Sequence, residues 1–300
     1  MNGRGLVMLG VLSLPAIGQE TPASPFAGGM LICSPNSPGT PENARPVMER
    51  FGAHLTKHLG SPCQPVYFNR AKDAREWLDK EAPRFAILSL DLYLRWREEL
   101  GLELVAQSER AGATSERLHV VVRGSSPVKA LGDLLPPALG RAPVIWSSHL
   151  EDPRFASRVA FQGALKVEGD GGEARVLTTH QALKALRRLK DGQPCEDQPV
   201  DAVVLDDAAW RALQDVPAFG GGALREVHTT PPLPTPPVVA FPRATPEERA
   251  GLLRVLQAMN QDEDGKELLA TLQVTGFKPA DSAAYQAAVE RYAQPPVPHE

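Results

Sequence analysis

The sequence predicts an α/β fold divided into two lobes, and a repeated phrase is the main reason. Residues 86–95 (AILSLDLYLR) and 202–211 (AVVLDDAAWR) align without a gap, each an apolar run followed by an acid and a helix-like stretch. Each follows a charged amphipathic segment, at 71–82 and 180–192. A helix that leads into a buried parallel strand produces this pattern. Its occurrence twice in 300 residues indicates two similar lobes with a cleft between them.

The composition is ordinary for a soluble globular protein. Apolar residues make up 42% and charged residues 23% of the chain. The apolar run near the N-terminus is too short to span a bilayer, and no second long apolar run follows it. The formal net charge is −4, so the chain lacks the basic excess of nucleic-acid binders. We therefore expect no nucleic-acid partner and no membrane-spanning segment.

The first residues are typical of an export signal. Arg4 supplies a positive charge, residues 5–16 are apolar, and residues 16–18 fit the small-x-small rule for cleavage before Gln19. An unprocessed apolar tail is the alternative. We expect residues 1–18 to be a signal peptide and the mature protein to be periplasmic.

Cysteine and histidine usage argues against a metal site. Cys33, Cys63 and Cys195 are widely spaced, and although one disulfide can form, the sequence does not say which pair forms it. There is no CxxC pair, and the seven histidines are scattered with no metal spacing. We expect no metal ion and no cofactor.

Lobe one is expected to comprise 29–122 plus 238–293. It begins with a strand at 29–34 and a helix at 41–58, in which Val47, Phe51 and Leu55 recur every four residues and form one buried face. Short apolar runs predict the next strands at 64–68, 85–90, 102–106 and 118–122, with a helix at 71–80.

Lobe two is expected at 127–228. Residues 124–127 (GSSP) punctuate the chain as a hinge before it. The same reasoning predicts strands at 142–146, 175–177, 200–205 and 224–227, and helices at 153–165 and 180–190. The chain then returns to lobe one as a strand at 238–241.

Three helices close the chain. Thr245-Pro246-Glu247-Glu248 is a strong helix start, with an N-cap threonine, proline at the first position and an acid at the third. That helix runs to about 259, and two more are expected near 263–273 and 281–292. Strands that alternate with helices in this way predict mainly parallel sheets flanked by helices.

Several segments carry a family resemblance. They are 118–134, 199–204 (PVDAVV) and the ending, where Gly265 and Leu269 precede Gly276-Phe277-Lys278-Pro279 and Tyr285. Their order resembles that of the phosphate-, phosphonate- and phosphite-type substrate-binding proteins of ABC transporters, and the similarity extends over nearly all of 29–293. The resemblance implies the two-lobed type II periplasmic-binding (transferrin-like) fold, a small-molecule ligand and a membrane permease as partner.

One segment departs from that family. Its members follow the first strand of lobe two with a loop rich in Ser, Thr and Gly, whereas residues 146–153 here read WSSHLEDP. Glu151 and Asp152 would repel an oxyanion.

In such folds, ligands bind outside the carboxyl ends of parallel strands, where helix N-termini offer free N–H groups to an anion. Polar residues at the expected strand ends are therefore our candidate ligand-binding residues: Ser34, Asn36, Ser89, Asp91, Tyr93, Ser147, Ser148, His149, Thr178, Thr179, Asp206 and Asp207. Several have a structural alternative, which is helix capping for Thr178, Thr179, Asp91 and Asp207, packing for Tyr93, and a solvated loop for His149.

Enzyme motifs are missing from the sequence. There is no GxSxG elbow, phosphate-binding GxxxxGK[ST] loop, HExxH or GxGxxG after a strand, so we expect no catalytic residues. The expected function is capture of a small, phosphate- or phosphonate-like anion in the interlobe cleft by an exported, monomeric solute-binding protein for ABC-type uptake. The alternative is a two-lobed sensor or interaction domain with a degenerate pocket, whose partner is a membrane sensor rather than a permease.

Overall fold

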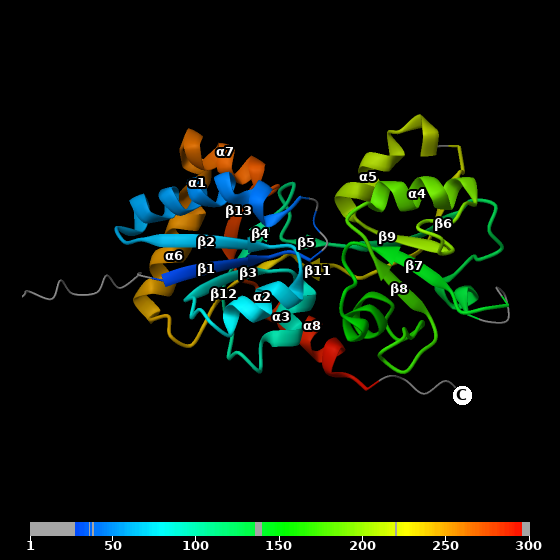
Figure 1. Ribbon diagram of the computed structural model, residues 1–300, viewed down its shortest axis with the longest axis horizontal. Helices are drawn as coiled ribbons and strands as arrows, with labels where there is room; N and C mark the ends of the chain where they lie inside the picture. The colour runs from blue at the N-terminus through cyan, green and yellow to red at the C-terminus, as the bar shows by residue number, and fades with distance from the viewer. Residues whose placement is uncertain (1–27, 36, 38, 136–139, 220, 296–300) are drawn as a thin grey trace, which may run out of the picture.

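Two lobes, each built on its own β-sheet, make up the structure, a computed structural model that describes residues 28–35, 37, 39–135, 140–219 and 221–295. Figure 1 shows the two sheets side by side, with helices packed around each. The two-lobed α/β architecture predicted from the sequence is therefore confirmed. The predicted signal peptide, 1–18, and the candidate Asn36 lie outside the described residues.

The first sheet has six strands, β1 (Gly28–Cys33), β2 (Cys63–Phe68), β3 (Phe85–Leu88), β4 (Glu103–Glu109), β12 (Pro237–Ala240) and β13 (Gly276–Pro279). Their order is β13-β4-β12-β3-β1-β2. β1 pairs in parallel with β2 and β3, while β12 lies antiparallel between β3 and β4. The helices on one face are α1 (Pro41–Leu59), α6 (Pro246–Ala258) and α7 (Glu263–Thr271), and those on the other are α2 (Ala71–Leu78), α3 (Leu90–Trp96) and α8 (Ser282–Ala293).

The second sheet has five strands, β6 (Leu118–Arg123), β7 (Val144–Ser147), β8 (Arg175–Thr178), β9 (Ala202–Asp206) and β10 (Leu224–Thr229), in the order β10-β6-β9-β7-β8. β7 pairs in parallel with β8 and β9, and β6 is antiparallel to β9 and β10. The remaining helices are α4 (Ala182–Asp191), α5 (Asp207–Gln214) and the short η1 (Leu131–Leu134), η2 (Phe155–Ala160), η3 (Pro217–Phe219) and η4 (Met259–Gln261).

Two details of the predicted topology are wrong. The strand expected to end lobe one at residue 122 is β6, which pairs in the second sheet, so the chain crosses between the lobes before Leu118. The sheets are also mixed rather than mainly parallel. β6 and β12 each enter a sheet directly from the other lobe, without a crossover helix, and strands that arrive in this way run antiparallel to their neighbours.

The apolar core has three parts. One cluster lies between the first sheet and α1, α6 and α7, and another lies between the second sheet and α4 and α5. The third covers the opposite faces of both sheets and continues from one lobe to the other, with Leu118 and Leu233 at the crossing. Burial of this continuous apolar surface stabilises the contact between the lobes as well as each lobe.

The lobes are joined where two extended segments pair. β5 (Ser115–Glu116) and β11 (Leu233–Pro234) form a two-stranded antiparallel sheet, which Figure 1 places between the two larger sheets. Next to it, the fully buried Thr235 donates a hydrogen bond from its hydroxyl to the carbonyl of Ser108, and its own carbonyl accepts one from the hydroxyl of Tyr285 at 2.6 Å. The last helix, α8, is thereby fixed to the crossing.

The same helix also reaches lobe two. The hydroxyl of Tyr292 on α8 donates to Asp152 Oδ2 at 2.6 Å, and Arg158 Nη1 donates to the carbonyl of Tyr292 at 3.2 Å. The expected hinge at 124–127 lies away from this region, because Gly124 N donates to the carbonyl of Ala223 inside lobe two.

The helix start at 245–248 is confirmed. Thr245 caps α6, its hydroxyl accepts from Glu248 N, and Glu248 Oε2 accepts from Thr245 N at 2.7 Å. Glu248 is fully buried and also forms an ion pair with Arg84 at 2.8 Å. One carboxylate therefore caps the start of a helix and neutralises a cation at the residue just before β3.

The helix expected at 153–165 is shorter than predicted, and it is a π-helix rather than an α-helix. Only η2 forms, as a π-helix in which Phe161 N donates to the carbonyl of Ala156. Gln162 and Gly163 then adopt positive φ values of 52° and 78°, which end the helix.

All three cysteines are free and buried. Burial raises the pKa of each thiol, that of Cys63 to about 11. Within the described part of the chain, no helix combines the length and apolar character needed to cross a bilayer.

Replacing Glu248 should expose its double role. We expect Glu248→Ala to lower the free energy of unfolding by about 2–3 kcal/mol, less than for a fully buried pair because Arg84 keeps 28% exposure. Glu247→Ala, one residue away and exposed, is the matched control and should leave stability nearly unchanged. Urea denaturation measures both, and equal effects of the two substitutions would contradict the assignment.

Candidate functional site

A pocket of about 270 Å³ lies between the lobes. Its walls include residues that directly follow β1 and β3 of the first sheet and β7 of the second, residues just beyond β8, and the last residue of β9. The parallel strands of both sheets thus direct their carboxyl ends to one cavity, which is where α/β folds of this kind hold ligands.

Half of the candidate residues line this pocket, and they are Ser34, Ser89, Asp91, Ser148, His149 and Asp206. Sequence reasoning missed Arg110 and Glu116, which line it as well. The same strand-end rule would have found Arg110, because it follows β4. The apolar run predicted that β4 ends at residue 106, whereas pairing with β13 extends it to Glu109.

Other candidates do not line the pocket, namely Tyr93, Ser147, Thr178, Thr179 and Asp207. The rings of Tyr93 and Tyr285 pack edge to face, with centroids 5.6 Å apart. Ser147 Oγ accepts a hydrogen bond from His149 N at 3.0 Å, and Thr179 Oγ1 accepts one from Gln181 N at 2.9 Å. These hydroxyls shape the turns after β7 and β8, so the predicted capping of α4 by the two threonines is also wrong.

Asp207 belongs to an ion cluster in lobe two. Its Oδ1 lies 3.0 Å from His119 Nε2, its Oδ2 accepts from Arg117 N, and His119 Nδ1 lies 2.6 Å from Glu226 Oε2. Burial favours a higher pKa for Asp207, but the hydrogen bonds from His119 and Arg117 N outweigh it and lower the pKa. Asp207 therefore ties α5 to β6 and does not act as its N-cap, which is Asp206.

Asp91 is the most deeply buried acid of the pocket, with 4% of its surface exposed. It is the second residue of α3, whose N-cap is Ser89. Burial raises the pKa of Asp91 to about 6, and the negative charges of Glu151 and Asp152 add to the rise. The nearby Ser89 hydroxyl and the Leu92 N–H favour the charged carboxylate and so offset part of the rise in pKa. The Ser89 hydroxyl lies near the carboxylate but does not meet the geometry of a hydrogen bond to it.

Two hydrogen-bonding groups of the pocket are buried and unpartnered among the described residues. These are the hydroxyl of Ser89 and the Nε of Arg110, both in residues that line the cavity. A buried donor without an acceptor costs free energy, which a ligand oxygen would recover. Arg110 is held in place by Glu116, whose carboxylate accepts from its Nη1 at 3.1 Å.

The lining of the pocket contains one guanidinium, that of Arg110, and four carboxyl groups, those of Asp91, Glu116, Glu151 and Asp206. Two of the four have basic neighbours, since Glu116 pairs with Arg110 and Asp206 Oδ2 lies 3.7 Å from His149 Nε2. The other two are less acidic than usual. Burial raises the pKa of Glu151, as it does that of Asp91, although Arg95 and Arg70 counteract part of the rise.

Side chains that could share a metal ion occur elsewhere in the described chain. His54 and His58 of α1 lie beside Asp262, and none of the three lines the pocket. The two histidines stand four residues apart on one helix, a metal-ligand spacing that the sequence analysis overlooked.

Two lobes joined by paired segments, with a polar pocket between them, give the same fold as solved periplasmic binding proteins. Residues 197–285 match the model of a family described as "ABC transporter, phosphonate, periplasmic substrate-binding protein". The family resemblance predicted from the sequence is therefore confirmed.

Solved structures with the same fold include three with close overall similarity. A Xanthomonas citri protein bound to ATP has a TM-score of 0.67 at 15% identity, covering 89% of this chain and 98% of that one. PhnD1 of Prochlorococcus marinus in complex with methylphosphonate has a TM-score of 0.62 at 15% identity, with coverage of 89% and 97%. A binding protein component of a Pseudomonas aeruginosa ABC phosphonate transporter has a TM-score of 0.61 at 16% identity, with coverage of 87% and 84%. A search of curated protein sequences finds no match.

Asp91→Asn should remove a pH-dependent loss of stability. The native pKa, about 6, exceeds the ordinary value of 3.8, so the folded state holds the proton more tightly and stability falls as the pH rises from about 4 to about 6. Because asparagine cannot ionise, the variant should gain up to about 3 kcal/mol relative to the wild type across this window. Urea denaturation at stepped pH measures the gain, and a constant difference would contradict the raised pKa.

Proposed function

We propose that this chain is a periplasmic solute-binding protein that captures a small phosphonate-like ligand and delivers it to an ABC permease. The observation that carries the proposal is the interlobe pocket, in which Ser89 Oγ and Arg110 Nε are buried without partners. The family match over 197–285, and the methylphosphonate bound by the Prochlorococcus protein, support the ligand class.

The size of the pocket favours a small ligand. Its volume of about 270 Å³ lies just below the roughly 300–1,000 Å³ usual for drug-sized molecules. Hydroxyl groups on both walls can donate to an oxyanion, since Ser34, Ser37 and Ser89 come from lobe one and Ser148 from lobe two. A ligand held by both walls favours closure of the lobes about the paired β5 and β11 segments.

The acidic residues of the pocket further restrict the kind of ligand that can bind there. Asp91 and Glu151 have no cationic side chain paired with them within 4.0 Å in the described chain, and a bare oxyanion would be repelled by them. A ligand that also carries an ammonium group would place a positive charge beside these carboxylates. We therefore infer that the ligand is an aminoalkylphosphonate-like zwitterion, whose phosphonate faces the serines and Arg110.

Ligand screening tests this proposal. At pH 7.5, where Asp91 is ionised, we expect 2-aminoethylphosphonate to bind at least about tenfold tighter than methylphosphonate, because one charge-assisted hydrogen bond contributes roughly 1.5–3 kcal/mol. Asp91→Asn should reduce this preference. Calorimetry measures both affinities. Equal affinities would contradict the zwitterion, and no binding of phosphonates, phosphate or sulfonates would overturn the anion site and favour the sensor alternative.

Substitutions of two serines with buried hydroxyls should distinguish an effect on ligand binding from an effect on stability. Ser89→Ala should weaken phosphonate binding by about 10- to 100-fold at little cost in stability, because its hydroxyl has no partner in the described chain. Ser157→Ala is the matched control, since this hydroxyl lies outside the pocket and accepts from Val167 N at 3.0 Å. It should cost about 1 kcal/mol of stability and leave affinity unchanged. The reverse pattern would remove Ser89 from the site.

A further inference from the structure

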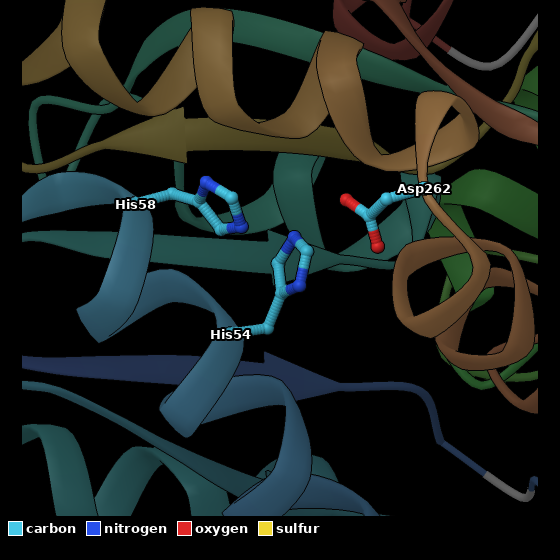
Figure 2. A group of neighbouring side chains, drawn as sticks. All are labelled: His54, His58 and Asp262. Atoms are coloured by element: carbon cyan, nitrogen blue, oxygen red, sulfur yellow. The ribbon is translucent and has the colours of Figure 1, made fainter.

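Three potential metal ligands meet on lobe one, away from the pocket. His54 and His58 lie one turn apart on α1, and a spacing of four residues puts both side chains on the same face of the helix. Asp262 comes from the residue that precedes α7. Figure 2 shows the two imidazoles and the carboxylate pointing toward one another across the gap between these helices.

The distances suit a bridging ion better than direct contact. One potential ligand atom from each residue lies within 4.8 Å of the others, yet neither histidine forms an ion pair with Asp262 within the described chain. Tetrahedral Zn²⁺ with bonds of about 2.0–2.2 Å holds its ligand atoms about 3.3 Å apart. Side-chain rotations that move these ligand atoms by about an ångström would bring them to that spacing.

The lone pairs needed for coordination are available. Neither imidazole donates or accepts a hydrogen bond in the described chain, although His54 is only 8% exposed. Asp262 uses Oδ1 to accept from Gly265 N at 2.7 Å, and its second oxygen is free to bind.

The backbone around Asp262 is held in one conformation. A side chain at Gly265 would place its Cβ 1.9 Å from the carbonyl oxygen of Met259, so only glycine allows this tight turn between η4 and α7. Arg50 of α1 also pairs with Glu267 of α7 at 2.9 Å. The two helices that carry the ligands are therefore already fixed relative to each other, which reduces the entropic cost of binding an ion.

From this geometry we infer that His54, His58 and Asp262 form a transition-metal site of the zinc class that joins α1 to the start of α7. Two imidazoles and one carboxylate favour Zn²⁺ over Mg²⁺ or Ca²⁺, which prefer oxygen ligands. Three protein ligands leave one position of a tetrahedral ion for water. The site is distinct from the interlobe pocket, since none of its ligands lines that cavity.

Zinc titration of the full chain tests the inference. The protein, free of any histidine tag and stripped with a chelator, is titrated with ZnCl₂ in a calorimeter and in a thermal unfolding assay. We expect one high-affinity ion per chain and a higher Tm with zinc. Mg²⁺ and Ca²⁺ should not compete. Absence of zinc binding overturns the inference.

Variants assign the ion to these residues. His58 is exposed on α1, so His58→Ala should fold normally and weaken zinc binding at least about 100-fold, since loss of mere outer-shell partners costs 10- to 100-fold. Asp262→Asn retains the N-cap oxygen but loses the charge, and should weaken binding at least about tenfold. Unchanged affinity in both variants would place the ion elsewhere and overturn the site.

Two controls sharpen this test. Lys57 is an exposed cation near His54 and Asp262, so Lys57→Gln should tighten zinc binding a few-fold. His228 lies in lobe two, where its Nε2 contacts the carbonyl of Ala160 at 3.0 Å, so His228→Gln should leave zinc affinity unchanged. Zinc affinity that falls with His228→Gln and not with His58→Ala would contradict the assignment.

Discussion

The hydrogen bond from Tyr285 to the carbonyl of Thr235 is the contact on which the arrangement of the two lobes depends. It lies beside the crossing, where Thr235 also donates to the carbonyl of Ser108 near the end of β4 in the first sheet. Tyr285 is 1% exposed and packs against Tyr93, so the bond is shielded from water and joins α8, α3 and the crossing segments in one cluster. The pocket lies next to this cluster, so the contacts of the cluster fix the position of the pocket. Tyr285, one of the residues that carry the family resemblance in the sequence, therefore fixes α8 to the crossing between the lobes.

Sequence reasoning succeeded where the signal is local. The capping box at 245–248 depends on residues three positions apart, and it forms as predicted. Strand-end serines are found in the same way, because a strand's carboxyl end is marked by the residue that stops its apolar run. Two failures have a long-range cause. β6 is an apolar run that fits either sheet, and only its partners β9 and β10 place it in the second. β4 extends past its apolar run because β13, some 170 residues later, pairs with it.

The repeated phrase shows how one residue changes a site. After aligned strands, α3 begins at Leu90 with Ser89 as its N-cap, whereas α5 begins at Asp207 with Asp206 as its N-cap. The aligned acids Asp91 and Asp207 therefore occupy the second and first helical positions, a difference of about 100° around the helix axis. One acid is buried in the wall of the pocket, and the other binds His119. Alignment alone could not separate these environments, because the two helices begin one residue apart relative to the aligned strands, and only the folded chain shows where each helix begins.

The three buried thiols bear on how the folded chain reacts with oxidants and thiol reagents. With only three cysteines, all free and all with raised pKa values, the protein offers little thiolate for oxidation or exchange. Oxidants and thiol reagents should therefore reach these cysteines mainly when the protein unfolds, because burial keeps the thiols protonated and away from solvent.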